Sequence, residues 1–217
     1  MLTPIPEPKT LLLASKSPRR KALLTALGFH VEVIASHAHT LRAFDGDETV
    51  LENEAPAVYV ERIAKQKFIE GLLRREELGL RTSIPVIAAD TVVSLEQTIF
   101  GKPKDLEEAT AFLNALSGRV HDVRTAVVIG TSRDTMKVAI NHSRVSFKPL
   151  TQVEIQAYCQ TDEPYDKAGG YGIQGLAGVF IDRIEGSYTG IMGLPLFETS
   201  ELLREIGLPV LSQNEPV

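Results

Sequence analysis

The stretch LLLASKSPRRKALLTALG at residues 11–28 decides the fold. Its first four residues form an apolar run typical of a buried strand, and a Ser-Lys-Ser break then leads to Pro18, which suits the first position of a helix. Ser17 is the expected N-cap of that helix. The apolar spacing predicts a helix face turned toward the sheet, made of Ala22, Leu23, Ala26 and Leu27.

The strand therefore ends at a helix N-terminus, a place that binds anions through free N–H groups and the positive end of the helix dipole. Polar side chains crowd into it, namely Ser15, Ser17, Arg19 and Arg20. This pattern indicates a phosphate cradle. An ordinary capped helix with two solvated arginines explains so short a pattern equally well.

The composition describes a folded chain. With 217 residues and 43% hydrophobic content, it can form one large α/β domain or two small lobes. We expect a single domain over residues 10–211, with frayed ends at residues 1–9 and 212–217. No apolar run approaches about 18 residues, and the N-terminus lacks the pattern of a signal peptide, which favours a cytoplasmic protein without a membrane segment.

The charge and cysteine content of the chain limit the kinds of binding partner and chemistry that we expect. The formal net charge of −5 argues against broad nucleic-acid affinity, because a phosphate backbone selects basic surfaces. The target should instead be small, with positive charge supplied locally. Cys159 is the only cysteine and falls on a helical face, so we expect a buried packing residue without a chemical role.

The remaining periodicity predicts a mixed sheet with flanking helices. Strands are expected at 29–35, 85–91 and 178–184, and an antiparallel hairpin at 120–131 and 136–147. Helices are expected from residue 56 through at least residue 72, at 105–118, at 151–160 and at 195–206, with a turn at 185–190. Asp105 with Glu108, and Thr151 with Glu154, have the spacing of capping boxes.

The sequence places two charged residues, Asp90 and Lys67, in apolar surroundings, and their positions require an explanation. The run at 85–91, PVIAADT, is apolar until it ends on an acid, and ligands collect at the carboxyl ends of strands in open α/β sheets. Asp90 is thus placed either for chemistry or as a capping aspartate. Lys67 sits in or at the edge of the apolar stripe of the long helix, so its ammonium either reaches water or points into a cleft to meet an anion.

Two loops complete the candidate site. Residues 162–175, DEPYDKAGGYGIQG, hold four glycines and a proline. Asp166, Lys167 and Gln174 are interleaved with these glycines, which favours ligand binding over a tight connector. Residues 36–54 are acidic with little periodicity, which favours an acidic surface loop over a mobile loop beside the site.

Five ordered motifs resemble the Maf nucleotide pyrophosphatases. They are SKSPRR at 15–20, AADT at 88–91, GKP at 101–103, LSGRVHDVRTAV at 116–127 and DKAGGYGIQG at 166–175, and the likeness covers residues 11–208. The resemblance implies a mixed twisted sheet with flanking helices and two lobes around a deep cleft, similar to inosine-triphosphatase-like proteins, and commonly a homodimer. It also implies cleavage of a nucleoside triphosphate between the α- and β-phosphates, giving a monophosphate and pyrophosphate, with a divalent cation.

The resemblance further implies roles for individual residues. Asp90 matches the proton acceptor and is the expected metal ligand, whereas Lys67 and Lys102 match lysines that face the phosphates. The substrate-selecting positions are Arg19, Thr91 and Gln174, and the other substrate-binding residues are Ser15, Ser17, Arg20 and Lys167. The GGYGIQG segment resembles the subgroup acting on dTTP and UTP, in which a glutamine amide, both donor and acceptor, can read a pyrimidine edge.

The chain departs from the family after the second strand, where an acidic pair is expected and His39 and Thr40 stand instead. We therefore expect the metal, Mg²⁺ or Mn²⁺, to arrive with the nucleotide, since Mg²⁺ accepts phosphate oxygens and water as ligands. His39 would favour Mn²⁺ or Co²⁺ if it reaches the site. The alternative is that Asp45, Asp47 or Glu48 folds in from the loop.

Two other functions stay open at this level. A regulatory or nucleic-acid-binding protein of septum formation would have no need of the set Asp90, Lys67 and Lys102. An enzyme of the inosine-triphosphate type would share the chemistry but not the GYGIQG loop. Release of pyrophosphate from UTP separates the enzyme from the regulator.

Overall fold

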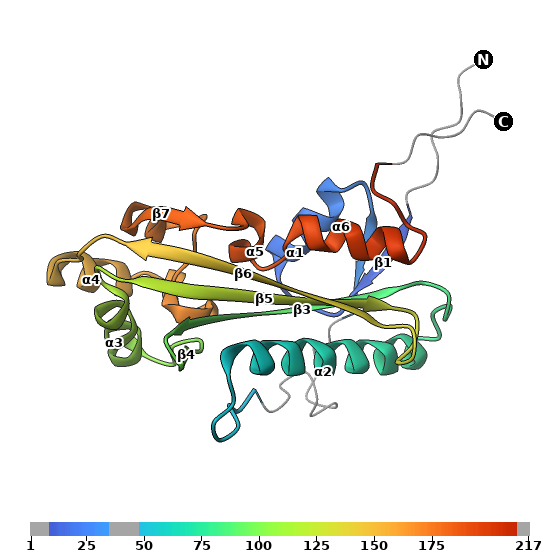
Figure 1. Ribbon diagram of the computed structural model, residues 1–217, viewed down its shortest axis with the longest axis horizontal. Coiled ribbons are helices and arrows are strands. Elements are labelled where there is room, and N and C mark those ends of the chain that lie inside the picture. Colours follow the sequence, from blue (N-terminus) through green and yellow to red (C-terminus); the bar gives the residue numbers. More distant parts are fainter. Residues whose placement is uncertain (1–8, 35–47, 212–217) are drawn as a thin grey trace, which may run out of the picture.

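The computed structural model describes residues 9–34 and 48–211, which form a single mixed sheet with helices on both faces (Figure 1). The strands are β1 (Thr10–Leu13), β2 (His30–Val33), β3 (Val86–Leu95), β4 (Thr98–Phe100), β5 (Val120–Gly130), β6 (Lys137–Phe147) and β7 (Ile181–Glu185). Their order is β2-β1-β3-β5-β6-β7, with β4 beside β3. β1 is parallel to β2 and β3, and the other pairs are antiparallel, so the predicted mixed α/β sheet is confirmed.

The helices surround this sheet in layers. They are α1 (Pro18–Ala26), α2 (Pro56–Glu77), α3 (Leu106–Leu116), α4 (Gln152–Cys159), α5 (Tyr188–Met192) and α6 (Leu196–Glu205), with 3₁₀ turns η1 (Glu163–Asp166), η2 (Ala168–Gly170) and η3 (Leu176–Phe180). Figure 1 shows α2 on one face of the sheet and α1, α5 and α6 on the other. In the described part of the chain, no helix has the length and apolarity needed to cross a bilayer.

The first helix starts where predicted but is rotated about its axis. Pro18 opens α1, and the Ser17 hydroxyl accepts from the N–H of Arg20, as an N-cap does. The predicted apolar face is wrong in part: Leu24 is fully buried, whereas Ala22 and Ala26 are exposed. Packing the leucines of α1 against the sheet removes more apolar surface from water than packing its alanines, and this decides the rotation.

β3 does not end on Asp90, contrary to the prediction. It continues for five more residues to Leu95, paired with β5 along most of its length. On its other side β1 pairs only with Val86 and Ile87, and β4 joins only from Val93 onward. The edge of β3 around Asp90 therefore has no strand partner among the described residues, and this open edge borders the candidate site.

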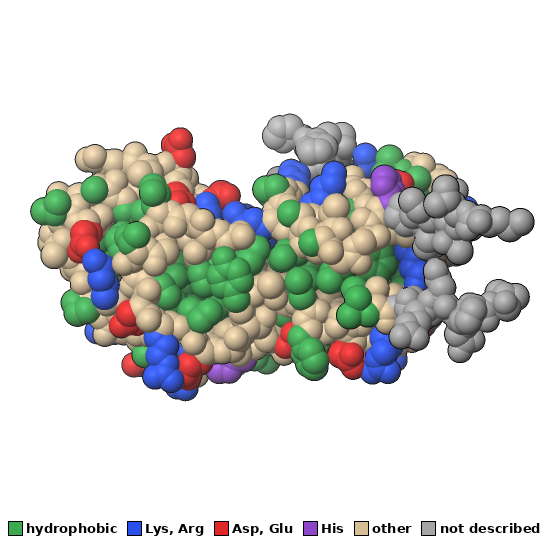
Figure 2. Space-filling model, turned by 90° about the horizontal axis from the view of Figure 1, so that it is seen from above, with side chains coloured by type: hydrophobic (Ala, Val, Ile, Leu, Met, Phe, Trp, Pro, Cys, Tyr) green, Lys and Arg blue, Asp and Glu red, His purple; other side chains and the backbone are tan. Residues whose placement is uncertain are grey.

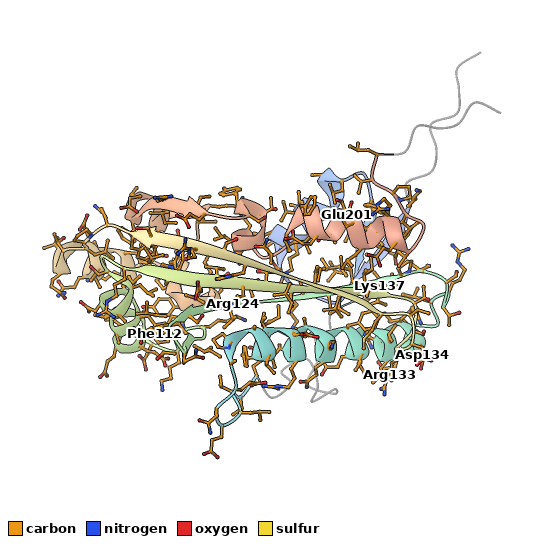
Figure 3. The ribbon with its side chains drawn as sticks, viewed as in Figure 1. Phe112, Arg124, Arg133, Asp134, Lys137 and Glu201 are labelled. Atoms are coloured by element: carbon orange, nitrogen blue, oxygen red, sulfur yellow. The ribbon has the colours of Figure 1, made fainter. Side chains whose placement is uncertain are left out.

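Most of the other local predictions are confirmed. The Asp105 carboxylate caps α3 by accepting from the N–H of Glu108, although the Glu108 side chain bonds the N–H of Lys104 rather than completing a capping box. Thr151 forms the full capping box of α4 with Glu154. The β5–β6 hairpin spans the molecule, and Figure 3 shows Arg133 and Asp134 of its turn at the opposite end from Phe112 of α3.

The C-terminal third differs in two places from the sequence prediction. The expected turn at 185–190 overlaps α5, a five-residue helix that Ser187 caps and that is too short to show a periodic pattern. The expected strand at 178–184 begins only at Ile181, because η3 occupies the preceding residues. Cys159 is 1% exposed, as a packing residue should be.

In the described part of the chain, three hydrophobic clusters form the core. α2 packs on one face of β1, β3 and β5, and α1 and α6 pack on the opposite face. The third cluster joins α3, α4 and the 3₁₀ turns to the far ends of β5 and β6. Residues of the first and third of these clusters, such as Ala14, Val92 and Val93, also line the cleft described below.

Candidate active site

A cleft of about 680 Å³ lies at the open edge of β3. Figure 2 shows Lys and Arg side chains beside a hollow between the two ends of the molecule. The residues predicted from sequence to form the site all line this cleft: Ser15, Ser17, Arg19, Arg20, Lys67, Asp90, Thr91, Lys102, Lys167 and Gln174. The structure thus brings them together, and their individual roles stay predictions.

Arg20 extends from the first turn of α1 into this cleft, where neutral oxygens hold its guanidinium. Nε donates to the Gly193 carbonyl at 2.7 Å, Nη1 to the Ser15 hydroxyl at 3.0 Å and Nη2 to the Thr91 hydroxyl at 3.2 Å. Among the described residues no carboxylate lies within ion-pair distance of it. Burial lowers the pKa of Arg20, yet a guanidinium stays protonated at neutral pH. A fixed positive charge without an acidic partner is suited to an anionic ligand.

The Thr91 hydroxyl is bonded to this arginine and is not a free group in the cleft. Its hydroxyl accepts from Arg20 and lies 2.9 Å from the Thr125 hydroxyl, which in turn donates to the Gly190 carbonyl at 2.8 Å. The chain of hydrogen bonds runs from β3 through β5 to α5. Thr91, predicted to select the substrate, is therefore placed to orient Arg20.

Lys67 lines the cleft between two carboxylates. Of the two interpretations of this lysine, its ammonium therefore points into a cleft rather than out to water. Its Nζ is 2.7 Å from Asp90 Oδ1 and 2.6 Å from Glu48 Oε1. Burial alone lowers the pKa of Lys67, but the two carboxylates outweigh burial and raise it. The pKa of Glu48 is raised by burial but lowered on balance by the Lys67 charge. Both groups are consequently charged at neutral pH.

Glu48 is the main residue that sequence reasoning underrated, because it lies within residues 36–54, a stretch interpreted as an acidic surface loop. α2 holds the segment 48–54 against itself: the Tyr59 hydroxyl donates to the Glu48 carbonyl at 3.0 Å. Arg62 donates to the Thr49 carbonyl at 3.0 Å and to both carboxylate oxygens of Glu54 at 2.7 Å. The available signal was an acid placed shortly before a helix whose first turns carry Tyr and Arg. His39, Thr40, Asp45 and Asp47 lie outside the described residues.

The donor set fits a hard divalent cation that also binds substrate. Asp90 and Glu48 converge on one ammonium group, so their carboxylates lie close together. No group of three or more His, Cys, Asp or Glu side chains in the described ranges could hold a metal alone. Mg²⁺ is commonly bound by one or two carboxylates together with phosphate oxygens and water. Asp90 and Glu48 match that pattern.

The other cations of the cleft differ in how free their charges are. Lys102 is exposed, with no ion pair to any described residue. Arg19 lies 3.9 Å from Asp166. Lys167 contacts the same Asp166 carboxylate and donates to the Glu163 carbonyl at 2.8 Å, so its charge is already matched within its own loop. Lys102 and Arg20 are therefore the cations best placed to meet a polyanion.

The glycine-rich loop presents Gln174 at the mouth of the cleft. The Gly175 N–H donates to the Gly172 carbonyl at 3.1 Å, so residues 172–175 form a turn with Ile173 and Gln174 at its corner. Tyr171, just before the turn, is buried and its hydroxyl lies 2.7 Å from His121 Nε2. Gln174 itself is exposed, as a side chain that meets a ligand must be.

The fold and this site define a mixed α/β protein with a cation-rich cleft of the kind that receives phosphate groups. The family model described as "Maf-like protein" matches residues 10–206, and the chain belongs to this family, as the motifs predicted. A curated relative from Bordetella avium (strain 197N), named dTTP/UTP pyrophosphatase, is 48% identical over 198 residues, which cover 91% of this chain and 96% of that protein. A relative of the same name from Nitrosomonas europaea is 45% identical over 205 residues, covering 94% and 98%.

Solved structures with a more distant likeness were also found. The Staphylococcus aureus Ham1 protein aligns with a TM-score of 0.42 and 17% identity, covering 64% of this chain and 72% of that chain. A nucleoside-triphosphatase / dITP/XTP pyrophosphatase from Mycobacterium abscessus aligns with a TM-score of 0.39 and 16% identity, covering 64% and 74%.

Proposed function

We propose that this chain is a nucleoside triphosphate pyrophosphatase that hydrolyses dTTP and UTP to the monophosphate and pyrophosphate. The names of relatives at 45% to 48% identity over nearly the whole chain support the activity and its substrates. The structural observation that carries it is the guanidinium of Arg20, which has neutral partners and lines the same cleft as the Lys67–Asp90 pair. The first is suited to a phosphate, and the second to activation of water.

In this mechanism the cations bind and orient the triphosphate. Arg20, held by Ser15 and Thr91, offsets the phosphate charge without having to reorganise during the reaction. Lys102, exposed in the same cleft, adds a further positive charge. Because phosphoryl transfer requires mainly positioning and charge stabilisation, such groups supply much of the catalysis.

Asp90 is the base. Its carboxylate accepts from Lys67, which fixes its orientation, and it takes a proton from a water molecule. The water oxygen bonds to the α-phosphorus while the bond from that phosphorus to the bridging oxygen breaks. Pyrophosphate leaves with the electron pair of that bond, and Asp90 releases its proton before the next turnover.

We infer that the enzyme uses a divalent cation, Mg²⁺, Mn²⁺ or Co²⁺, held by Asp90 and Glu48. Such a cation neutralises charge that develops on the phosphate oxygens. The two carboxylates on one ammonium support this assignment, and delivery of the metal by the nucleotide alone is the alternative that the test below distinguishes. Neither carboxylate is a soft ligand, which favours Mg²⁺ or Mn²⁺.

Substrate preference is the first test. UTP and dTTP should be cleaved about ten- to a hundredfold more efficiently than ATP and GTP, since an unpaired amide costs about 1 to 3 kcal/mol. We expect Gln174→Ala to bring these kcat/KM values close together, because the amide at the corner of the turn is removed. Gln160→Ala, an exposed glutamine at the end of α4 and away from the cleft, is the control. Preference for GTP, or an unchanged ranking in Gln174→Ala, would contradict the assignment.

A further inference from the structure

The turn that carries Gln174 rests on a carboxylate that has no part in the chemistry proposed above. Glu163, from η1, accepts three hydrogen bonds. Its Oε2 accepts from the N–H of Leu176 at 2.7 Å, and its Oε1 from the N–H of Ala177 at 3.2 Å and the Tyr158 hydroxyl at 3.0 Å. One side chain thus holds the two residues that begin η3.

The contact reaches the residue next to Gln174. A Cβ built on Gly175 would lie 2.2 Å from Glu163 Oε2, so the carboxylate lies directly against the glycine backbone. The N–H of the same Gly175 closes the turn by donating to the Gly172 carbonyl. Any shift of Glu163 therefore moves the end of the turn on whose corner Gln174 lies.

The other end of the turn is anchored to the sheet by Tyr171. The Tyr171 hydroxyl lies 2.7 Å from His121 Nε2 on β5, and its ring packs edge-on against Phe147 with centroids 4.8 Å apart. Lys167 lies against Gly172, where an added Cβ would come within 2.8 Å of its Cδ. With its first residues fixed to the sheet, the orientation of the turn depends on what holds its last residue.

We propose that Glu163 is a positioning residue that sets the nucleobase selectivity of the cleft by fixing the turn that presents Gln174. The inference rests on the proposed function, since it concerns how the same site distinguishes bases. Its effect should be confined to base reading, because Arg20 and Asp90 are held by α1, β3 and α2 through bonds that do not involve Glu163.

The test compares kcat and KM of Glu163→Gln for UTP and GTP with pyrophosphate detection. The amide keeps the size of the side chain but turns an NH₂ group toward at least one N–H donor. We expect the ratio of kcat/KM for UTP to that for GTP to fall roughly tenfold, carried by a higher KM for UTP, with kcat changed less than about threefold. Glu154→Gln is the matched control, because its carboxylate also accepts a backbone N–H at a helix start, at 2.8 Å, but outside the cleft.

Two further variants keep the test decisive if Glu163→Gln folds poorly. Gly175→Ala forces the intact carboxylate away and should reproduce the loss of selectivity. The double variant Glu163→Gln/Gln174→Ala should be no less selective than Gln174→Ala alone, because both changes act on one contact. Additive losses would contradict the inference.

The outcomes separate this inference from the proposed function. A wild-type protein without preference for UTP and dTTP removes the proposed function itself. A wild-type protein with that preference, together with an unchanged UTP to GTP ratio in Glu163→Gln and Gly175→Ala, removes only the role of Glu163. A fall in kcat that is equal for both nucleotides would also overturn it, since that is the signature of a merely structural residue.

Discussion

Asp90 and Thr91 are consecutive residues that serve opposite faces of the sheet. Side chains alternate along a strand, so Asp90 meets Lys67 on the α2 face while Thr91 meets Arg20 on the α1 face. Both line one cleft because the edge of β3 is open at this point and the cleft extends around it. This two-residue segment thereby connects the proposed base to Arg20, the proposed anion-binding arginine.

Asp90→Asn tests the proposed role of this carboxylate as the base. The amide preserves shape but is a much weaker base and metal ligand, so kcat for UTP should fall by at least about a hundredfold. The fold should persist, because Lys67 keeps its ion pair with Glu48 at 2.6 Å. Pyrophosphate release measures the rate, thermal unfolding checks the fold, and Asp182→Asn on β7 is the control. Turnover near the wild-type rate would rule out Asp90 as the base.

Among the elements, helix α2 contributes to the site in two ways. Its middle supplies Lys67, and its first turns bind the segment 48–54 through Tyr59 and Arg62. The Glu54 side chain in this clasp is only 4% exposed, so the bidentate pair with Arg62 is better shielded from water than a surface salt bridge. The helix thus fixes both the lysine and the acid that meets it.

This arrangement predicts which acid completes the metal site. Glu48→Gln should raise the Mg²⁺ concentration for half-maximal UTP hydrolysis roughly tenfold, since a charged ligand beside Asp90 is lost. Glu52→Gln, an exposed acid of the same segment, should leave it unchanged. If the nucleotide alone delivers the metal, Glu48→Gln has no such effect, and Thr40→Glu lowers that concentration instead.

Across the whole molecule, buried polar side chains join segments that belong to different elements. Arg75 of α2 donates to the carbonyls of Thr82 at 2.9 Å and Ile84 at 3.1 Å, before β3, and to that of Thr131 at 2.8 Å, after β5. His121 bonds the glycine-rich loop to the sheet. Because His121 is buried, a change in its protonation acts on global stability.

His121 predicts how stability depends on pH. Burial lowers its pKa from 6.5 to about 4, so between these values the unfolded chain binds more protons and the fold loses stability as pH falls. The loss reaches about 3 kcal/mol at pH 4. Urea unfolding at several pH values should therefore show a steeper decline below pH 6.5 for wild type than for His121→Gln, which keeps a partner for the Tyr171 hydroxyl.

The comparison with the variant is needed because Glu70 acts in the opposite direction. Burial raises the pKa of Glu70 to about 7, so its contribution to stability is lost as pH rises toward that value. The difference between wild type and His121→Gln cancels this effect. Parallel curves for the two proteins would show that His121 does not titrate as inferred.

Local signals in the sequence determined the elements and most of the site. Several features depend on residues within a few positions of one another, so they can be predicted without a structure. They are the helix start at Pro18, the caps at Ser17 and Thr151, and the two long β segments of the β5–β6 hairpin with their short polar turn. The ordered motifs likewise named nine of the ten predicted residues that line one cleft, and the apolar stripe of the long helix named the tenth, Lys67.

Only the tertiary structure decided the features that depend on residues far apart in the chain. The rotation of α1 onto Leu24 follows from what packs against it, and the open edge beside Asp90 exists because β1 pairs with only two residues of β3. Glu48 reaches Lys67 because α2 clasps the intervening segment, and Glu163 holds the Gln174 turn from the opposite end of the same loop. Such contacts arise from the closure of long loops, which no local pattern records.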